Sequence, residues 1–190
     1  TTATQTITVE DTTDPVLAGV PSDVTVECDA IPSASIVSAT DNCSIGLTVN
    51  YNETIGSGCP YTIIRIWETT DNCGNSSIAT QTITVEDTTD PAWVGVPLDI
   101  TVECDEIPSV ASPTATDNCD TDVAILFNET TTGNCTDGYT ITRTWTATDN
   151  CGNTGIRSQV ITLEDTTNPV LSGVPSDVTV ECDNVSIVPV

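Results

Sequence analysis

Polar and apolar residues alternate along most of this chain in short runs. At residues 23–28, two valines and a cysteine fall on one face of an extended strand, while Thr25 and Glu27 fall on the other. Similar runs occupy residues 47–53, 61–67 and 77–86. Turn residues such as the glycine and proline of residues 56–60 separate these runs. No segment shows an apolar repeat of 3.6 residues, so the pattern predicts an all-β protein.

The clearest strand lies at residues 139–146. Tyr139, Ile141, Arg143 and Trp145 point to one side, and threonines occupy every position between them and Thr146. Together with a weaker strand at residues 35–40, these runs predict six or seven short strands in each repeat. We therefore expect an immunoglobulin-like or Greek-key β-sandwich.

The strands belong to a tandem repeat. The sequence Val-Glu-Asp-Thr-Thr-Asp-Pro at residues 9–15 returns at 85–91 and, altered, at 163–169. Cys28, Cys104 and Cys182 are separated by 76 and 78 positions. The repeat predicts the last strand of a preceding module at 1–10, complete modules at 11–86 (module 1) and 87–164 (module 2), and the start of a truncated further module at 165–190.

Charge narrows the choice of partners. The chain has 28 acidic residues, three arginines and no lysine or histidine, for a net charge of −25. No basic patch can be formed, which excludes nucleic acid as a partner. Such self-repulsion favours either high ionic strength or bound cations, although an acidic surface that only aids solubility is the simpler alternative. No apolar run is long enough to span a membrane, and we expect this segment to belong to a longer mature chain.

The nine cysteines indicate disulfides formed in an oxidising compartment. Structural zinc sites usually use closely spaced cysteine pairs, whereas the spacings within a module here are 14 to 16 residues. Four cysteines allow three pairings. If successive strands alternate in direction, the first and third cysteine of a module share one pole and the second and fourth share the other. The predicted pairs are Cys28–Cys59, Cys43–Cys73, Cys104–Cys135 and Cys119–Cys151, with Cys182 lacking a partner in the chain.

Acidic residues gather at the joints between modules. The same alternation brings each joint close to two Asp-Asn turns of the module that follows. Calcium prefers six to eight hard oxygen ligands, and this chain has no histidine for softer metals. Calcium is therefore the predicted cofactor, and the alternative is that these are solvated turn residues. The candidate ligands are Glu10, Asp11, Asp14, Asp41 and Asp71; Glu86, Asp87, Asp90, Asp117 and Asp149; and Glu164 and Asp165, where Asn168 replaces an aspartate and should weaken the site.

Each complete module carries one tryptophan beside an arginine, Arg65 with Trp67 in module 1 and Arg143 with Trp145 in module 2. A glutamate, Glu53 or Glu129, ends the preceding strand. We expect the tryptophan to be core and the arginine to pair with the glutamate or lie along the ring. The alternative is an exposed aromatic residue that stacks on sugars, for which Trp93 is the better candidate because module 1 has leucine there.

The motifs Asp-Val-Thr-Val-Glu-Cys-Asp and Ala-Thr-Asp-Asn-Cys, and residues 139–153, resemble hyalin-repeat (HYR) and HYR-like modules. The cysteine-bearing form resembles tandem repeats of giant surface adhesins and secreted proteins of gliding bacteria. This resemblance covers the whole chain and implies an immunoglobulin-like fold in stalks, spacers or adhesive arrays. It also implies O-glycosylation at the Asp-Thr-Thr sequences, on Thr12, Thr88 and Thr166.

We expect no enzyme, because histidine, lysine and a reactive thiol are missing and every candidate acid belongs to a recurring joint or turn. The leading hypothesis is a structural segment of an extracellular or bacterial cell-surface stalk, adhesin or fibre, stiffened by disulfides and calcium. The alternative is a carbohydrate- or surface-binding array. Expected partners are neighbouring modules of the same chain, other copies in fibres, and glycans. Assembly between chains in which residues 1–10 complete a neighbour's sandwich is less favoured than a longer array of modules.

Overall fold

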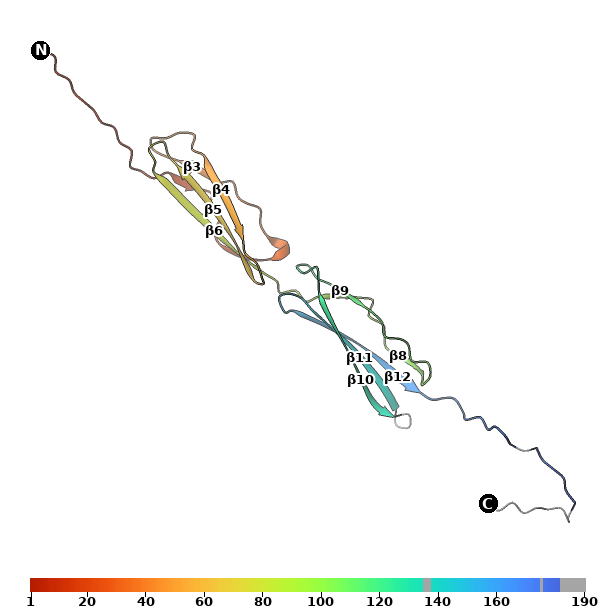
Figure 1. Cartoon of the computed structure of the whole chain (residues 1–190). Coiled ribbons are helices and arrows are strands. Elements are labelled where there is room, and N and C mark those ends of the chain that lie inside the picture. The colour runs from red at the N-terminus through yellow and green to blue at the C-terminus, as the bar shows by residue number, and fades with distance from the viewer. Residues whose placement is uncertain (135–137, 175, 182–190) are drawn as a thin grey trace.

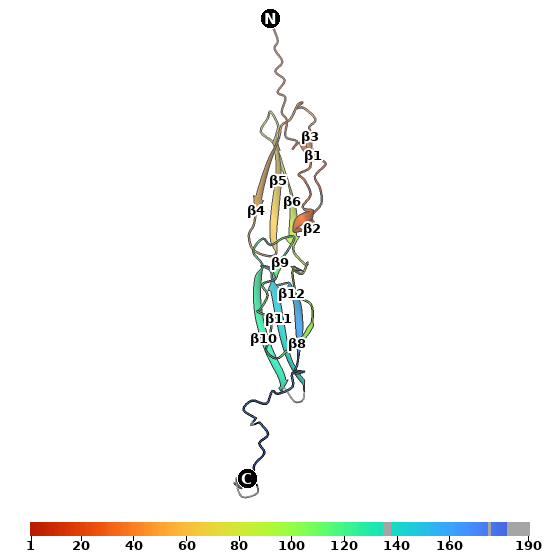
Figure 2. The ribbon, with the colours of Figure 1, turned by 90° about the vertical axis from the view of Figure 1, so that its right-hand side faces the viewer.

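The computed structural model describes residues 1–134, 138–174 and 176–181. Two β-rich modules lie end to end in an elongated molecule (Figures 1 and 2), joined by a short linker between residues 86 and 92. Apart from the one-turn 3-10 helix η1 (Cys28–Ala30), every assigned element among the described residues is a strand. The predicted all-β fold of tandem immunoglobulin-like sandwiches is confirmed.

Module 1 combines a four-stranded sheet, in the order β2-β6-β5-β4, with a two-stranded sheet formed by β1 and β3. β4 and β6 pair antiparallel with β5, whereas β2 runs parallel to β6 along the edge of the sheet. The strands are β1 (Val16–Ala18), β2 (Val24–Glu27), β3 (Ser38–Thr40), β4 (Val49–Ile55), β5 (Tyr61–Thr70) and β6 (Ser76–Glu86).

Module 2 repeats this topology strand for strand, with sheets β10-β11-β12-β8 and β7-β9. Its edge strand β8 again runs parallel to the last strand, β12. The strands are β7 (Ala92–Val94), β8 (Ile100–Glu103), β9 (Thr114–Thr116), β10 (Ala124–Asn134), β11 (Gly138–Thr148) and β12 (Thr154–Glu164).

The core lies on one face of each four-stranded sheet, as the alternation predicts. Along β5, every second residue from Ile63 is buried, and Trp67 is only 2% exposed. β11 follows the same pattern, with Trp145 also 2% exposed. Tyr51 and Phe127 contact these two indole rings from the neighbouring strands. Both tryptophans are therefore core residues and cannot stack on a sugar.

The buried arginine of each module forms the expected ion pair. Arg65 Nε lies 2.7 Å from Glu53 Oε2, and Arg143 Nε lies 2.8 Å from Glu129 Oε2. Arg65 also donates to the Pro32 carbonyl, which ties the long loop after η1 to the sheet. Hydrogen bonds from Tyr51 and from Arg65 lower the pKa of Glu53. These pairs are structural, since each satisfies a charge that the core would otherwise leave unpaired.

Trp93 is half-buried, so the expectation that it is the exposed aromatic residue is wrong. Its indole lies against Gly155, where an added Cβ would meet Trp93 Nε1 at 3.2 Å and the Pro91 carbonyl at 2.5 Å. In module 1 these places are held by Leu17 and Ser77. The larger side chain, Trp93, thus occurs in the module with the smaller facing residue, Gly155, as close packing requires.

The segments outside the two modules contain no strand in their described parts. Residues 1–10, 165–174 and 176–181 are extended or irregular. No strand is assigned to residues 1–10. That they are the last strand of a preceding module stays a prediction, because a strand forms a ladder only beside a neighbouring strand. No helix in the described part of the chain is long and apolar enough to cross a membrane.

Candidate functional site: the joint between modules

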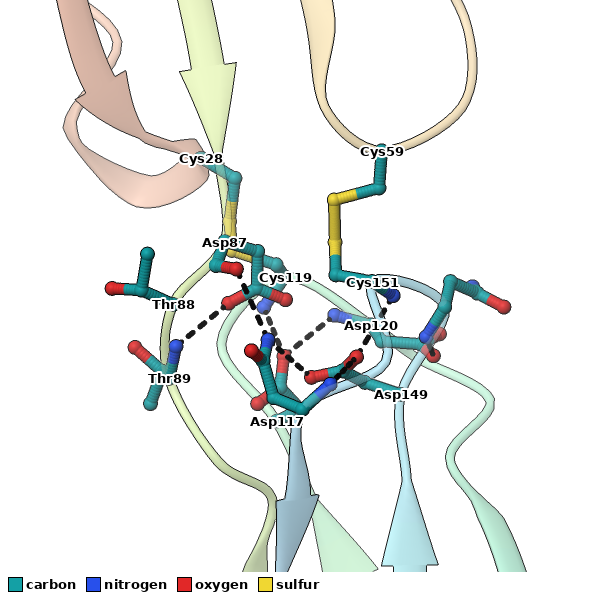
Figure 3. The surroundings of a disulfide bond; sticks show 12 residues. Cys28, Cys59, Asp87, Thr88, Thr89, Asp117, Cys119, Asp120, Asp149 and Cys151 are labelled. Carbon is teal, nitrogen blue, oxygen red and sulfur yellow. Dashed lines mark hydrogen bonds between the residues drawn. A yellow bond between two sulfur atoms is a disulfide. The ribbon is translucent and has the colours of Figure 1, made fainter.

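Two disulfides cross the joint between the modules. Cys28, which follows β2, is bonded to Cys119 with a Cα–Cα distance of 5.7 Å. Cys59, which precedes β5, is bonded to Cys151 with a Cα–Cα distance of 5.1 Å. Figure 3 shows both bonds passing from the lower edge of module 1 to the loops of module 2. The modules are therefore covalently linked three times, by the backbone and by two disulfides.

The predicted pairings within modules are wrong where the structure describes them. Cys28 and Cys59 do share a pole, but they are not bonded to each other, and Cys119 and Cys151 are not bonded to each other either. Cys43 and Cys73 are both free thiols. The Cys104–Cys135 pairing involves a residue outside the described part of the chain.

The strand order explains the error. β6 lies between β2 and β5, so the ends of those two strands are separated by two inter-strand spacings, roughly 9 to 10 Å. Disulfides need Cα atoms within about 7 Å. Alternation of strand direction places the cysteines at the correct poles, but it does not reveal the intervening strand. The partner that lies close enough is the facing cysteine of the next module.

Rigid Asp-Asn turns present the cysteines of module 2. The backbone N–H of Cys119 donates to Asp117 Oδ1 and that of Cys151 donates to Asp149 Oδ1, both at 2.8 Å. The Asn153 side chain donates to Asp149 Oδ2 and to the Asp87 carbonyl of the linker, at 2.8 and 3.0 Å. These bonds stabilise each turn and tie the Asp149 turn to the linker (Figure 3).

The same turns bring carboxylates together. In module 1, ligand oxygens of Asp11, Asp41 and Asp71 all lie within 4.8 Å of one another. In module 2, the equivalent residues Asp87 and Asp149 approach within the same limit, and Asp117 is near enough to perturb Asp87. The sulfur atoms nearest this second cluster belong to disulfides, so only oxygen ligands are offered there.

Each cluster contains two buried carboxylate oxygens that find no hydrogen-bond donor among the described residues. They are Asp11 Oδ2 and Asp41 Oδ2 in module 1, and Asp87 Oδ2 and Asp117 Oδ2 in module 2. A buried carboxylate oxygen without a donor is costly, and buried charges are normally paired or bound to a metal. The equivalent atoms are unsatisfied in both modules, which fits a cation held at the same place in each.

The surroundings of the joint raise the pKa of Asp87 and lower that of Asp149. Burial, followed by the charges of Asp117, Asp149 and Glu27, raises the pKa of Asp87 despite a hydrogen bond from the backbone of Thr89. Asp149 is also buried, which raises its pKa, but hydrogen bonds from Asn153 and nearby backbone N–H groups outweigh this effect and lower it overall. One acid of the joint is thus held ionised by donors, while the other is ionised at a cost.

The acids nearest the module surface do not join these clusters. Glu10, Asp14, Glu86 and Asp90 are exposed, and Asp90 instead accepts a hydrogen bond from the backbone of Thr154. Glu164, Asp165 and Asn168 are exposed as well, and no second set of Asp-Asn turns faces them among the described residues. Because Asn168 is equivalent to the exposed Asp14 and Asp90, its substitution for aspartate does not remove a clustered ligand.

Two residues of the joint were not predicted. Glu27, at the end of β2, accepts hydrogen bonds from the backbone and hydroxyl of Thr88, at 3.2 and 2.6 Å, and Glu103 accepts the same pair from Thr166. Asp120 Oδ2 accepts from the backbone of Asn150, a place that Ser44 takes in module 1. The only sequence signal was the recurrence of Val-Glu-Cys-Asp and the change from Cys-Ser to Cys-Asp.

Comparison with known proteins does not assign a family. No family model and no curated protein matches the sequence. Similar solved structures include Drosophila N-cadherin EC1-4 (TM-score 0.35, 14% identity, 80% of this chain and 50% of that one). Another is human mucin-like protocadherin EC1-2 (TM-score 0.32, 12% identity, 78% of this chain and 97% of that one). A third is protocadherin gamma C5 EC1-3 (TM-score 0.33, 11% identity, 78% of this chain and 68% of that one). This chain spans half of the N-cadherin fragment, and TM-scores this low carry no argument about function.

Proposed function

We propose that this chain is a non-catalytic structural segment of a long extracellular stalk, adhesin or fibre, built from HYR-like modules joined in series. The observation that supports this most strongly is the pair of disulfides across the joint. A flexible linker would leave two modules free to pivot, whereas two separate covalent links fix both bend and twist. Disulfides also favour an extracellular location, since they persist in oxidising compartments.

Calcium at the joints is the second part of the proposal. In module 1 the ion would be held by Asp11, Asp41 and Asp71, and in module 2 by Asp87, Asp117 and Asp149. These residues fit the ion because they offer only oxygen ligands and include two buried oxygens without donors in each cluster. When bound, calcium would neutralise charges that otherwise repel across the joint. The chain's own hydrogen bonds already hold the turns in position.

The alternative, a carbohydrate-binding array, has less support. Trp67 and Trp145 are buried, and Trp93 is half-buried against Gly155, so the three tryptophans of the chain do not form a sugar-stacking surface. O-glycosylation at Thr12, Thr88 and Thr166 is a further part of the proposal, as a modification of a surface stalk. At Thr88 it would compete with the hydrogen bond to Glu27.

Equilibrium calcium binding tests this proposal. We expect two ions per chain, one ion after Asp87→Asn, and none after Asp11→Asn is added. Glu68→Gln serves as the matched control, because it removes the same charge from an exposed position on β5 and should leave two ions bound. A stoichiometry unaffected by Asp11→Asn and Asp87→Asn, or a parent chain that binds no calcium, would refute calcium at the joints.

A further inference from the structure

Cys43 and Cys73 occupy the same places in module 1 as Cys119 and Cys151 do in module 2. Cys43 lies 76 positions before Cys119, and Cys73 lies 78 positions before Cys151. Both are exposed thiols. Cys73 follows β5, whereas Cys59, which bonds to module 2, precedes that strand, so Cys73 and its neighbour Cys43 lie at the end of module 1 opposite the joint. In module 2, the equivalent end is where the two disulfides from module 1 arrive.

The turns that carry these thiols are already arranged as they are in the closed joint. The backbone N–H groups of Cys43 and Cys73 donate to Asp41 Oδ1 and Asp71 Oδ1 at 3.0 and 2.8 Å, just as those of Cys119 and Cys151 donate to their aspartates. Asn75 donates to the Asp11 carbonyl at 3.1 Å, matching Asn153 in module 2. The end of module 1 is therefore organised before any partner is present.

The equivalent of the hydrogen bond between Thr88 and Glu27 can also form at module 1, because Thr12 is free to make the same contact with a preceding module. In the closed joint, Thr88 of the linker donates its hydroxyl to Glu27 of the preceding module. Thr12 is the equivalent of Thr88, follows the same Glu-Asp pair and is exposed. The first joint sequence thus carries every element of the second except the preceding module itself.

We propose that Cys43 and Cys73 form a docking face for a second module of the same kind, which bonds to them through its own counterparts of Cys28 and Cys59. The partner is a module with a cysteine just after its edge strand and another just before its central strand. Its counterpart of Glu27 receives Thr12. This inference extends the proposed stalk function, but it concerns the covalent pairing and does not depend on calcium.

The chemistry is thiol oxidation by a disulfide reagent. For each bond, two cysteine thiols and one small-molecule or protein disulfide give one inter-module disulfide and two reagent thiols. The two electrons and two protons of each pair of thiols pass to the reagent, so closing the whole joint consumes two equivalents. Because both pairs are held at a preformed face, closing the first bond brings the second pair together.

The test uses the full chain extended by one module. Residues 1–86 are fused directly to residues 11–190, and the Glu86-Asp11 junction reproduces the native Glu-Asp step found at residues 10–11 and 86–87. The first copy carries Cys43→Ser and Cys73→Ser, so that every remaining Cys43 and Cys73 belongs to the second copy. The protein is refolded in a glutathione redox buffer, alkylated and mapped without reduction.

We expect Cys28–Cys43 and Cys59–Cys73 peptides in amounts equal to Cys28–Cys119 and Cys59–Cys151, with almost no alkylated Cys43 or Cys73. Adding Cys28→Ser and Cys59→Ser to the first copy should make both thiols almost fully alkylated. A Cys43–Cys73 bond, or free thiols in a sample that forms Cys28–Cys119, would overturn the proposal. The map is repeated in chelator, where it should not change, so a failure of calcium binding is recognised separately.

Discussion

Removing one of the two disulfides at the joint should destabilise the whole chain by an amount that follows from its topology. The perturbation is Cys59→Ser with Cys151→Ser, which leaves Cys28–Cys119 intact. In the parent chain, the Cys59–Cys151 bond closes a loop that runs through the Cys28–Cys119 bond. This loop consists of the 31 positions from Cys28 to Cys59 and the 32 from Cys119 to Cys151. A loop of this length corresponds to about 4 kcal/mol of lost unfolded-state entropy.

The assay is differential scanning calorimetry in non-reducing buffer at fixed calcium. For a cooperative unit of this size, about 4 kcal/mol corresponds to a Tm lower by about 8–16 °C. Cys43→Ser with Cys73→Ser is the matched control, since it removes two thiols that form no bond in this chain and should shift Tm by no more than about 2 °C. If the two double variants melt together, the joint disulfides do not couple the modules as argued.

Three further substitutions test the joint and the core. Without calcium, ionised Asp87 costs stability that grows as pH rises through its raised pKa, so Asp87→Asn should raise Tm at pH 7 in chelator; a lower Tm would contradict this. Gly155→Ala should cost about 1–3 kcal/mol in urea unfolding, because its Cβ would lie 2.5 Å from a backbone carbonyl oxygen, and an unchanged midpoint would refute that packing. Glu53→Gln should cost about 2 kcal/mol by leaving buried Arg65 without its carboxylate, whereas exposed Glu68→Gln should cost almost nothing; equal effects would count against the ion pair.

Local alternation was sufficient to predict the strands and their buried face. β5 and β11 bury the residues that the pattern placed together, including both arginines and both tryptophans. Each side chain's direction depends only on its place along its own strand, so this information is local. The sequence also placed Cys28 and Cys59 at one pole correctly.

Pairing could not be predicted in the same way, because it depends on the order of strands across the sheet. Nothing within residues 24–27 shows that β2 lies beside β6 and not beside β5, yet that choice separates Cys28 from Cys59. The acids illustrate the same limit. Asp11 and Asp14 are three positions apart in one motif, but only Asp11 joins the cluster, since its Oδ2 atom is buried whereas Asp14 is exposed.

β5 lies between Cys59 and Cys73 along the chain. This has a mechanical consequence for a stalk in which disulfides join each module to both of its neighbours. Tension entering at Cys73 leaves at Cys59 after only 14 positions, ten of which are the already extended strand β5. Fully stretched, that segment is about 50 Å long, whereas a fully extended repeat of 76 residues without cross-links would be about 250 Å long. Such a filament would therefore lengthen very little under tension. Under high force it would break only when a covalent bond in this path broke.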